Sequence, residues 1–180
     1  GETVMLRHEK TFVNKNLFAL FLCADMDDAA IDAKLAEADK VDYERIGERM
    51  RAECVYLNVD EKHSADRGVA LVKKAAATNR AVILRCVNAD LAGQILKEAA
   101  GDVKVLVGAC ADNWEAMNTL AKEHDLVLGV CCKDLSECHD VIEKLEEAGN
   151  KNLIINVCAD TIKDAFAYTV QIRLAALKDG

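Results

Sequence analysis

The chain has 180 residues, a formal net charge of −8, 52% hydrophobic residues and 30% charged residues. This length and balance predict one globular domain with a real core and exclude a disordered chain. The acidic charge and the lack of a Lys/Arg cluster argue against nucleic acid or an anionic membrane as a partner. Because the N-terminus has no apolar signal segment and no run reaches the ~20 residues of a membrane helix, we expect a cytoplasmic protein.

The chain begins with a segment of weak alternation, residues 1–16, which predicts a small hairpin that plugs the N-terminal end of a barrel. Six short, nearly continuous apolar runs follow. Such runs are typical of strands that are covered on both faces. The six predicted strands are 17–23, 54–60, 81–87, 103–110, 126–132 and 152–158.

Amphipathic helices are predicted between and after these strands, because apolar residues recur at helical spacing. The first crossover is longer and predicts two helices, the second of which begins at Asp42, with Val41 and Ile46 at the spacing of a hydrophobic staple. The apolar stripes of the last three helices are Trp114, Met117, Leu120 and Ala121, then Leu135, Cys138, Ile142 and Leu145, then Ile162, Phe166, Val170, Leu174 and Leu177.

Six successive βα units over 17–180 predict an α/β fold with a parallel sheet and right-handed crossovers. A flavodoxin-like open sheet is one possibility, and a partial TIM-like (β/α) barrel that fills 1–180 as a single domain fits the unbroken succession better. A complete barrel has eight units. We therefore expect either a piece of a larger protein or an open barrel whose edge is covered by another chain, a second copy included.

Five of the six junctions between strand and helix carry a cysteine and then an aspartate, within 23–28, 86–91, 110–115, 131–137 and 158–163. The sixth junction, 58–66, has Asn58 and Asp60 near the position of the cysteine. We interpret the aspartates mainly as helix N-caps. Asp112 with Glu115 and Asp134 with Glu137 have the spacing of capping boxes.

The cysteines admit two interpretations. Thiols at the carboxyl ends of barrel strands surround one mouth, where zinc or an iron–sulfur cluster would bind. Free cysteine is also a small, commonly buried hydrophobe, and the chain has no C-x-x-C pair, so packing is the favoured interpretation. Without a secretory signal we expect mostly reduced thiols. The candidate metal ligands are Cys23, Cys86, Cys110, Cys131 (or Cys132) and Cys158.

Other catalytic patterns are missing from the sequence. It has no readable triad, no G-x-G-x-x-G and no P-loop. Polar side chains near strand ends would suit hydrogen bonds to a pterin, although such residues are common in βα loops. These candidate cofactor contacts are Asn58, Asp60, Asn88, Asp112 and Asn156.

Four segments, 1–12, 43–53, 112–124 and 171–180, resemble one family in the same order. The most specific are "VMLRHEKTF" and "DNWEAM". The family is the large (gamma) subunit of the corrinoid iron–sulfur protein of the acetyl-CoA decarbonylase/synthase (CO dehydrogenase/acetyl-CoA synthase) complex. The resemblance implies a central TIM-like barrel between a domain that binds a [4Fe–4S] cluster and a domain that binds the corrinoid. It therefore implies no cofactor in this stretch of chain.

The resemblance also implies a role. The barrel would be a scaffold that docks the small subunit, in a carrier that takes a methyl group from methyl-pterin through a methyltransferase and passes it to acetyl-CoA synthase. On this hypothesis the barrel alone is not catalytic. Two alternatives stay open: a metal- or iron–sulfur-binding barrel that uses the strand-end cysteines, and a pterin-binding methyltransferase-like barrel.

Overall fold

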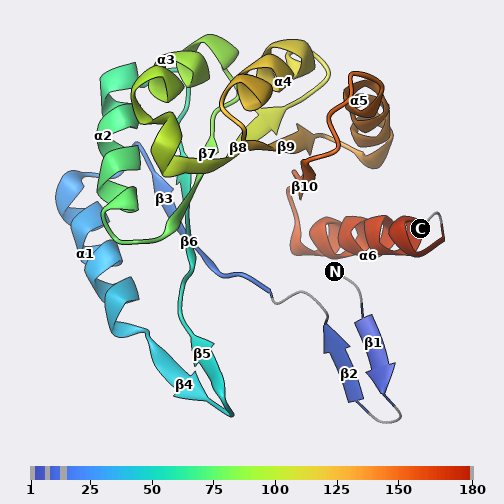
Figure 1. Cartoon of the computed structure of the whole chain (residues 1–180), viewed down its shortest axis with the longest axis horizontal. Coiled ribbons are helices and arrows are strands. Elements are labelled where there is room, and N and C mark those ends of the chain that lie inside the picture. The colour runs from blue at the N-terminus through green and yellow to red at the C-terminus, as the bar shows by residue number, and fades with distance from the viewer. Residues whose placement is uncertain (1–2, 7–8, 13–15, 179–180) are drawn as a thin grey trace.

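The computed structural model describes residues 3–6, 9–12 and 16–178. Its main feature is a parallel sheet of six strands in which spatial order follows chain order (Figure 1). Each strand pairs only with the preceding and following strand of this sheet, as in a TIM barrel, but the sheet is not closed and β3 and β10 are its two edges. The predicted α/β, barrel-like fold is confirmed. The strands are β3 (Ala19–Cys23), β6 (Cys54–Asn58), β7 (Ala81–Arg85), β8 (Val103–Ala109), β9 (Val127–Cys132) and β10 (Leu153–Val157).

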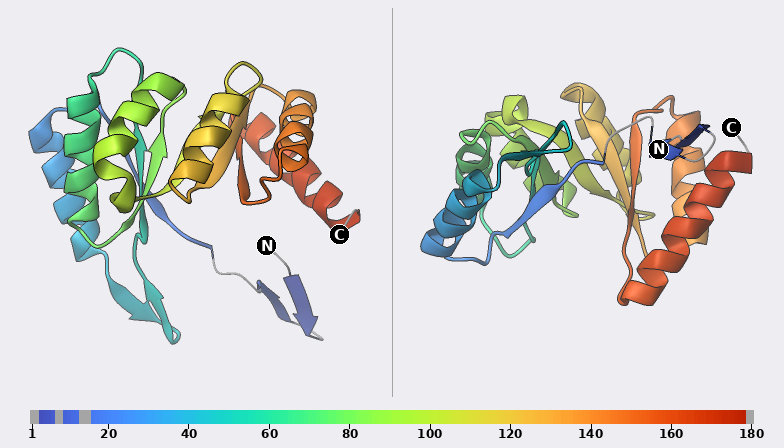
Figure 2. Two further views of the ribbon diagram at one scale, coloured as in Figure 1. Left: turned by 45° about the horizontal axis from the view of Figure 1, so that its top comes forward. Right: turned by 90° about the horizontal axis from the view of Figure 1, so that it is seen from below.

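A helix follows each of these strands, and α1 to α5 line one side of the curved sheet (Figure 2). Ion pairs fasten the first two units together: Arg67 binds Asp28, and Lys74 binds Asp32 at 2.6 Å. The helices are α1 (Asp28–Lys40), α2 (Ala65–Ala76), α3 (Ala89–Ala99), α4 (Trp114–Glu123), α5 (Leu135–Glu147) and α6 (Ile162–Lys178), with a short 3₁₀ turn η1 (Ala100–Asp102).

The core lies between the sheet and these helices. Alternate strand residues such as Leu57 and Leu84 are fully buried against helix residues such as Ile95. Successive residues of a strand point to opposite faces, so their neighbours lie on the other side of the sheet. There Phe21 and Ile154 are 52% and 45% exposed. From the apolar runs we expected both faces of the sheet to be covered, whereas the described helices cover only one face.

The crossover between β3 and β6 corrects one prediction. The segment expected to form a helix from Asp42 is instead the antiparallel hairpin β4 (Tyr43–Arg45) and β5 (Glu48–Met50). Its turn places Ile46 at φ 52° and Gly47 at φ 75°, the backbone of a type I′ turn. Arg49 Nε and Nη2 donate to the two Asp42 carboxylate oxygens at 2.6 and 2.5 Å. Val41 and Ile46 are exposed, so they form no hydrophobic staple.

Within the first sixteen residues, β1 (Thr3–Leu6) and β2 (Glu9–Phe12) pair as an antiparallel hairpin. The rest of that segment, apart from Asn16, lies outside the described residues. The role of a barrel plug stays a prediction.

The last helix leaves its apolar stripe exposed. In α4 and α5 the predicted stripes are buried at Met117 and Leu145. In α6, by contrast, Ile162 is 90% and Phe166 72% exposed, and the side chain of Leu177 is outside the described residues. The helix is confirmed, but its stripe does not pack into the core. None of the described helices is both long and apolar enough to cross a membrane.

Candidate functional site

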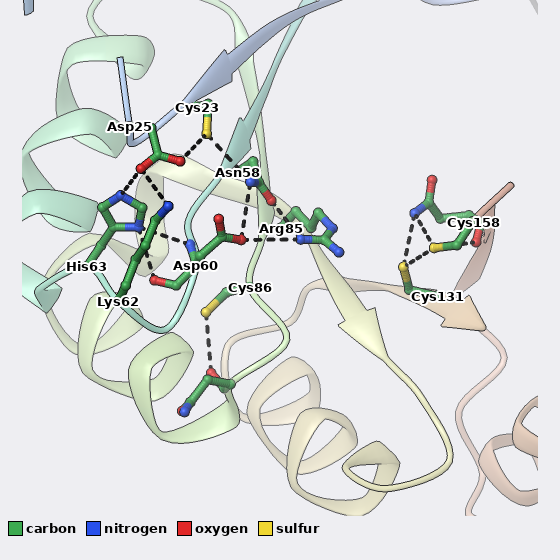
Figure 3. Close-up of polar contacts among 12 residues, drawn as sticks. Cys23, Asp25, Asn58, Asp60, Lys62, His63, Arg85, Cys86, Cys131 and Cys158 are labelled. Carbon is green, nitrogen blue, oxygen red and sulfur yellow. Dashed lines mark hydrogen bonds and ion pairs between the residues drawn. The ribbon is translucent and has the colours of Figure 1, made fainter. Parts of the chain in front are cut away.

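The carboxyl ends of the six strands bring polar and sulfur-bearing side chains to one edge of the sheet, which we call the strand-end rim (Figure 3). Its members are Cys23, Asn58, Arg85, Cys131 and Asn156, together with residues of the loops that follow their strands. The parallel register explains the alignment, because Cys23 pairs with Asn58 and Asn58 pairs with Arg85.

Asp25 is the centre of one group at the rim. Lys62 Nζ lies 2.8 Å and His63 Nε2 3.3 Å from its Oδ1, and the Cys23 thiol donates to its Oδ2 at 3.5 Å. The hydrogen bond from Lys62 holds the pKa of Asp25 below its usual value, with smaller contributions from Cys23 and His63. The same contact raises the pKa of Lys62. Asp25 and Lys62 therefore stay a charged pair at neutral pH.

Arg85, the last residue of β7, links that strand to the end of β6. Its Nη1 donates to Asn58 Oδ1 at 2.7 Å and lies 3.7 Å from Asp60 Oδ1. Asn58 Nδ2 in turn donates to Asp60 Oδ1 at 3.3 Å and to Cys23 Sγ at 3.6 Å. The structure thus brings together two of the predicted cofactor contacts, Asn58 and Asp60. Arg85 was missed, because a single charged residue inside an apolar run gives no signal of its own.

A cleft of about 640 Å³ opens between the ends of β6, β7 and β8. Three of the five predicted cofactor contacts, Asp60, Asn88 and Asp112, line it. Arg85 supplies a positive charge at its wall. Asn156 lies apart, against Cys131 near the end of β9 and Cys158 just after β10. The cleft can present hydrogen-bond donors and acceptors to a polar ligand.

Asn113 holds one wall of the cleft in place. Its Oδ1 accepts from the Cys110 backbone at 2.8 Å, and its Nδ2 donates to the Val87 and Gly108 carbonyls at 2.7 and 3.0 Å. Gly108 has φ 142° at a shift of register between β8 and β9. A Cβ there would collide with the Cys86 carbonyl oxygen.

The capping interpretation holds at some junctions and fails at others. Asp134 accepts from the Glu137 backbone at 2.9 Å and caps α5 as predicted, while Glu137 Oε2 accepts at 3.0 Å from the backbone of Lys133, the residue before the cap. The box of Asp112 with Glu115 is wrong. Helix α4 begins at Trp114, one residue later than that box requires, and the residue before it is Asn113. At the other junctions the caps are Asp27, Ser64 and Asn88 for the first three helices, and Thr161 accepts from the Asp164 backbone at the start of α6.

The predicted metal ligands do not gather at one point. Cys86 is buried in the core, where burial raises the pKa of its thiol, and it donates to the Asn88 carbonyl at 3.3 Å. Cys132 and Cys138 are buried on the helix side, and burial raises the pKa of each. Of the five candidates, only Cys131 and Cys158 meet, with sulfurs 2.6 Å apart.

The described residues therefore do not fit a zinc ion or an iron–sulfur cluster. Structural zinc takes four ligands and a [4Fe–4S] cluster four thiolates. In the described part of the chain, no three His, Cys, Asp or Glu side chains lie close enough together to hold a metal. The contact of Cys131 with Cys158 is a pair of thiols, with Asn156 Nδ2 donating to Cys131 Sγ at 3.2 Å.

Solved structures of similar fold include an enzyme of sialic acid metabolism. The N-acetylneuraminic acid (sialic acid) synthetase of Leptospira borgpetersenii matches with a TM-score of 0.55 and 12% identity, over 89% of this chain and 60% of that one. At this identity the likeness concerns the fold alone.

Curated relatives share more of the sequence. The corrinoid/iron-sulfur protein large subunit of Moorella thermoacetica is 27% identical over 98% of this chain and 40% of its own length. The acetyl-CoA decarbonylase/synthase complex subunit gamma 2 of Methanosarcina mazei is 27% identical over 98% and 39%, and the gamma subunit of Archaeoglobus fulgidus 24% over 98% and 38%. The chain spans about two fifths of the length of these relatives.

The predicted resemblance to the large (gamma) subunit agrees with these names. A family model described as the CO dehydrogenase/acetyl-CoA synthase delta subunit matches residues 1–180. The chain therefore belongs to the CO dehydrogenase/acetyl-CoA synthase delta subunit family.

Proposed function

We propose that this barrel is the scaffold and docking domain of a corrinoid iron–sulfur methyl carrier, which takes a methyl group from methyl-pterin and delivers it to acetyl-CoA synthase. The match to the family over residues 1–180 carries the proposal, and the names of the relatives give the type of carrier. In such a carrier the corrinoid supplies the methyl-transfer chemistry. The barrel's own residues then bind partner proteins and hold other domains in place.

The exposed stripe of α6 supports a docking role. Ile162, Phe166, Val170 and Leu174 are 90%, 72%, 40% and 52% exposed and recur every four residues. A contiguous apolar surface of this kind commonly marks a contact between proteins. We assign it to the small subunit of the corrinoid protein. The methyltransferase and acetyl-CoA synthase would then meet other parts of the carrier.

A titration of the full-length carrier with its small subunit, followed by calorimetry, tests this assignment. Phe166→Ser is expected to weaken binding at least about tenfold, the loss of one anchoring aromatic side chain. Lys163→Ala is the matched control, because Lys163 is exposed on the same helix but outside the apolar stripe. Equal affinity of the Phe166 variant and the parent protein would assign the docking surface elsewhere. No binding by the parent protein would refute the docking function.

The cleft at the strand ends favours a second function, the binding of a pterin. Asp60, Asn88 and Asp112 offer hydrogen bonds, and Arg85 lies beside them. Calorimetric titration with a methyl-tetrahydropterin tests it, and Arg85→Met is expected to weaken any binding measured. Absence of heat with the folded parent protein would dismiss this function and leave the docking proposal standing.

A further inference from the structure

We propose that Cys131 and Cys158 form a reversible dithiol–disulfide site, which small-molecule disulfides such as oxidised glutathione oxidise and which ties the edge strand β10 to β9. The proposal stands apart from the methyl-carrier function. Its basis is the contact of the two sulfurs, 2.6 Å apart, at the ends of adjacent strands (Figure 3).

The register of the two strands brings the thiols together. Asn156 pairs with Cys131 in the parallel ladder of β10 and β9, and Cys158 follows two residues later, which returns it to the same face. Val130 and Cys132, the neighbours of Cys131, lie buried in the core, so Cys131 itself points to the opposite side. Disulfide sulfurs lie about 2.05 Å apart, so a shift of about 0.5 Å joins the pair.

The pair is also accessible. Cys158 is exposed and Cys131 half-buried. A second pair of neighbouring cysteines, Cys132 and Cys138, is buried between the sheet and α5, at 5% and 6% exposure. A dissolved disulfide therefore reaches the first pair and not the second. The buried pair is therefore an internal control: its two cysteines are also neighbours, but the reagent cannot reach them.

Oxidation of the two cysteines by oxidised glutathione proceeds in two exchange steps. The Cys131 thiolate attacks one sulfur of oxidised glutathione, forms a mixed disulfide and releases one glutathione thiolate. Cys158 then loses its proton to solvent, and its thiolate attacks the Cys131 sulfur and releases the second glutathione. Two protein thiols are oxidised by two electrons in all, and the reagent is reduced to two thiols.

Asn156 and Arg85 assist this sequence. The Asn156 amide donates to Cys131 Sγ at 3.2 Å and holds that sulfur beside Cys158. Loss of solvent around the Cys158 sulfur and the adjacent Cys131 raise the pKa of Cys158 to about 12, and Arg85 opposes them. A mixed disulfide at Cys131 carries no charge on its sulfur, so one of these two causes disappears when Cys158 must react.

Incubation of the reduced full-length protein with oxidised glutathione, under anaerobic conditions, tests the proposal. Of the eight cysteine thiols within residues 1–180, two are expected to be lost. Digestion with trypsin should then give a cross-link between peptides 123–133 and 152–163. Since the first peptide contains both Cys131 and Cys132, Cys131→Ser must abolish the cross-link.

Two further variants complete the experiment. Cys158→Ser should stop at the mixed disulfide and keep one glutathione on Cys131, whereas Cys110→Ser, the control at the end of β8, should form the cross-link like the parent. Circular dichroism checks that each variant is folded. The proposal is overturned if the folded parent forms no cross-link, or if the cross-link persists through Cys132 in Cys131→Ser.

Discussion

A buried hydrogen bond between two asparagines joins α4 to the loop after α5. Asn150 Nδ2 donates to Asn118 Oδ1 at 2.8 Å, and both residues are only 7% exposed. Asn150 Oδ1 accepts in turn from the Asn152 backbone at 3.0 Å. We predict that Asn150→Ala lowers the free energy of unfolding by about 3 kcal/mol.

The magnitude follows from the groups that lose partners. Two hydrogen bonds disappear, each with a net value of about 1 kcal/mol, and the buried Asn118 carbonyl keeps no partner from that side, which costs about 1–3 kcal/mol more where water does not replace it. The sum lies between about 2 kcal/mol, where water replaces the lost partner, and about 5 kcal/mol, where it does not. For a chain of this size, each kcal/mol corresponds to about 2–4 °C in Tm.

Urea unfolding at pH 7, followed by circular dichroism, measures the change, with the exposed Lys151→Ala as control. Asn118→Leu combined with Asn150→Leu should recover part of the loss, because replacing both partners leaves no unpaired side-chain amide. If Asn150→Ala changes the free energy of unfolding by less than about 1 kcal/mol, or if the double variant is worse than the sum of the single variants, the reasoning is wrong.

Three other predictions concern the rim and the helix contacts. Gly108→Ala should lower the free energy of unfolding by more than about 1 kcal/mol, since φ 142° and the Cys86 carbonyl exclude a Cβ, while Gly101→Ala, with open space around it, should be near neutral in the same urea assay. Oxidation of Cys131 and Cys158, 27 positions apart, should raise the free energy of unfolding by up to about 3.5 kcal/mol through loop entropy, and no increase in a protein with the bond proven by mass spectrometry would contradict this. Arg67 lowers the pKa of Asp28 in the folded state, so this ion pair stabilises the protein above about pH 4, and the contribution is lost as the pH falls through the folded pKa. Asp28→Asn should therefore flatten the acid side of a plot of urea midpoint against pH. An unchanged plot would refute this prediction.

The sequence was informative where one local pattern decides the structure. Continuous apolar runs predicted all six strands of the sheet, and the spacing of Asp134 and Glu137 predicted the helix cap that Asp134 forms. The hairpin after α1 was missed because its turn uses Ile46 at positive φ, where Asn or Asp is the usual signal. The staple spacing around that residue then favoured a helix.

The rim was predictable in position but not in partners. Residues at strand ends were expected to share one edge, and Asn58 and Asp60 do meet there. Which cysteines approach each other depends on register, strand twist and the shift at Gly108, and none of these can be read from spacing along the chain. The same limit hid Arg85, because its role depends on Asn58 of the neighbouring strand.

The strand order of the sheet has a consequence for how the molecule comes apart. Every ladder in it joins consecutive βα units, from β3 to β10, so stability resembles a sum of nearest-neighbour interfaces, as in repeat proteins. Loss of β10 removes one interface and leaves the other four ladders intact. Opening should then proceed from the two edges inward, with β7 and β8 the last strands to lose their backbone hydrogen bonds.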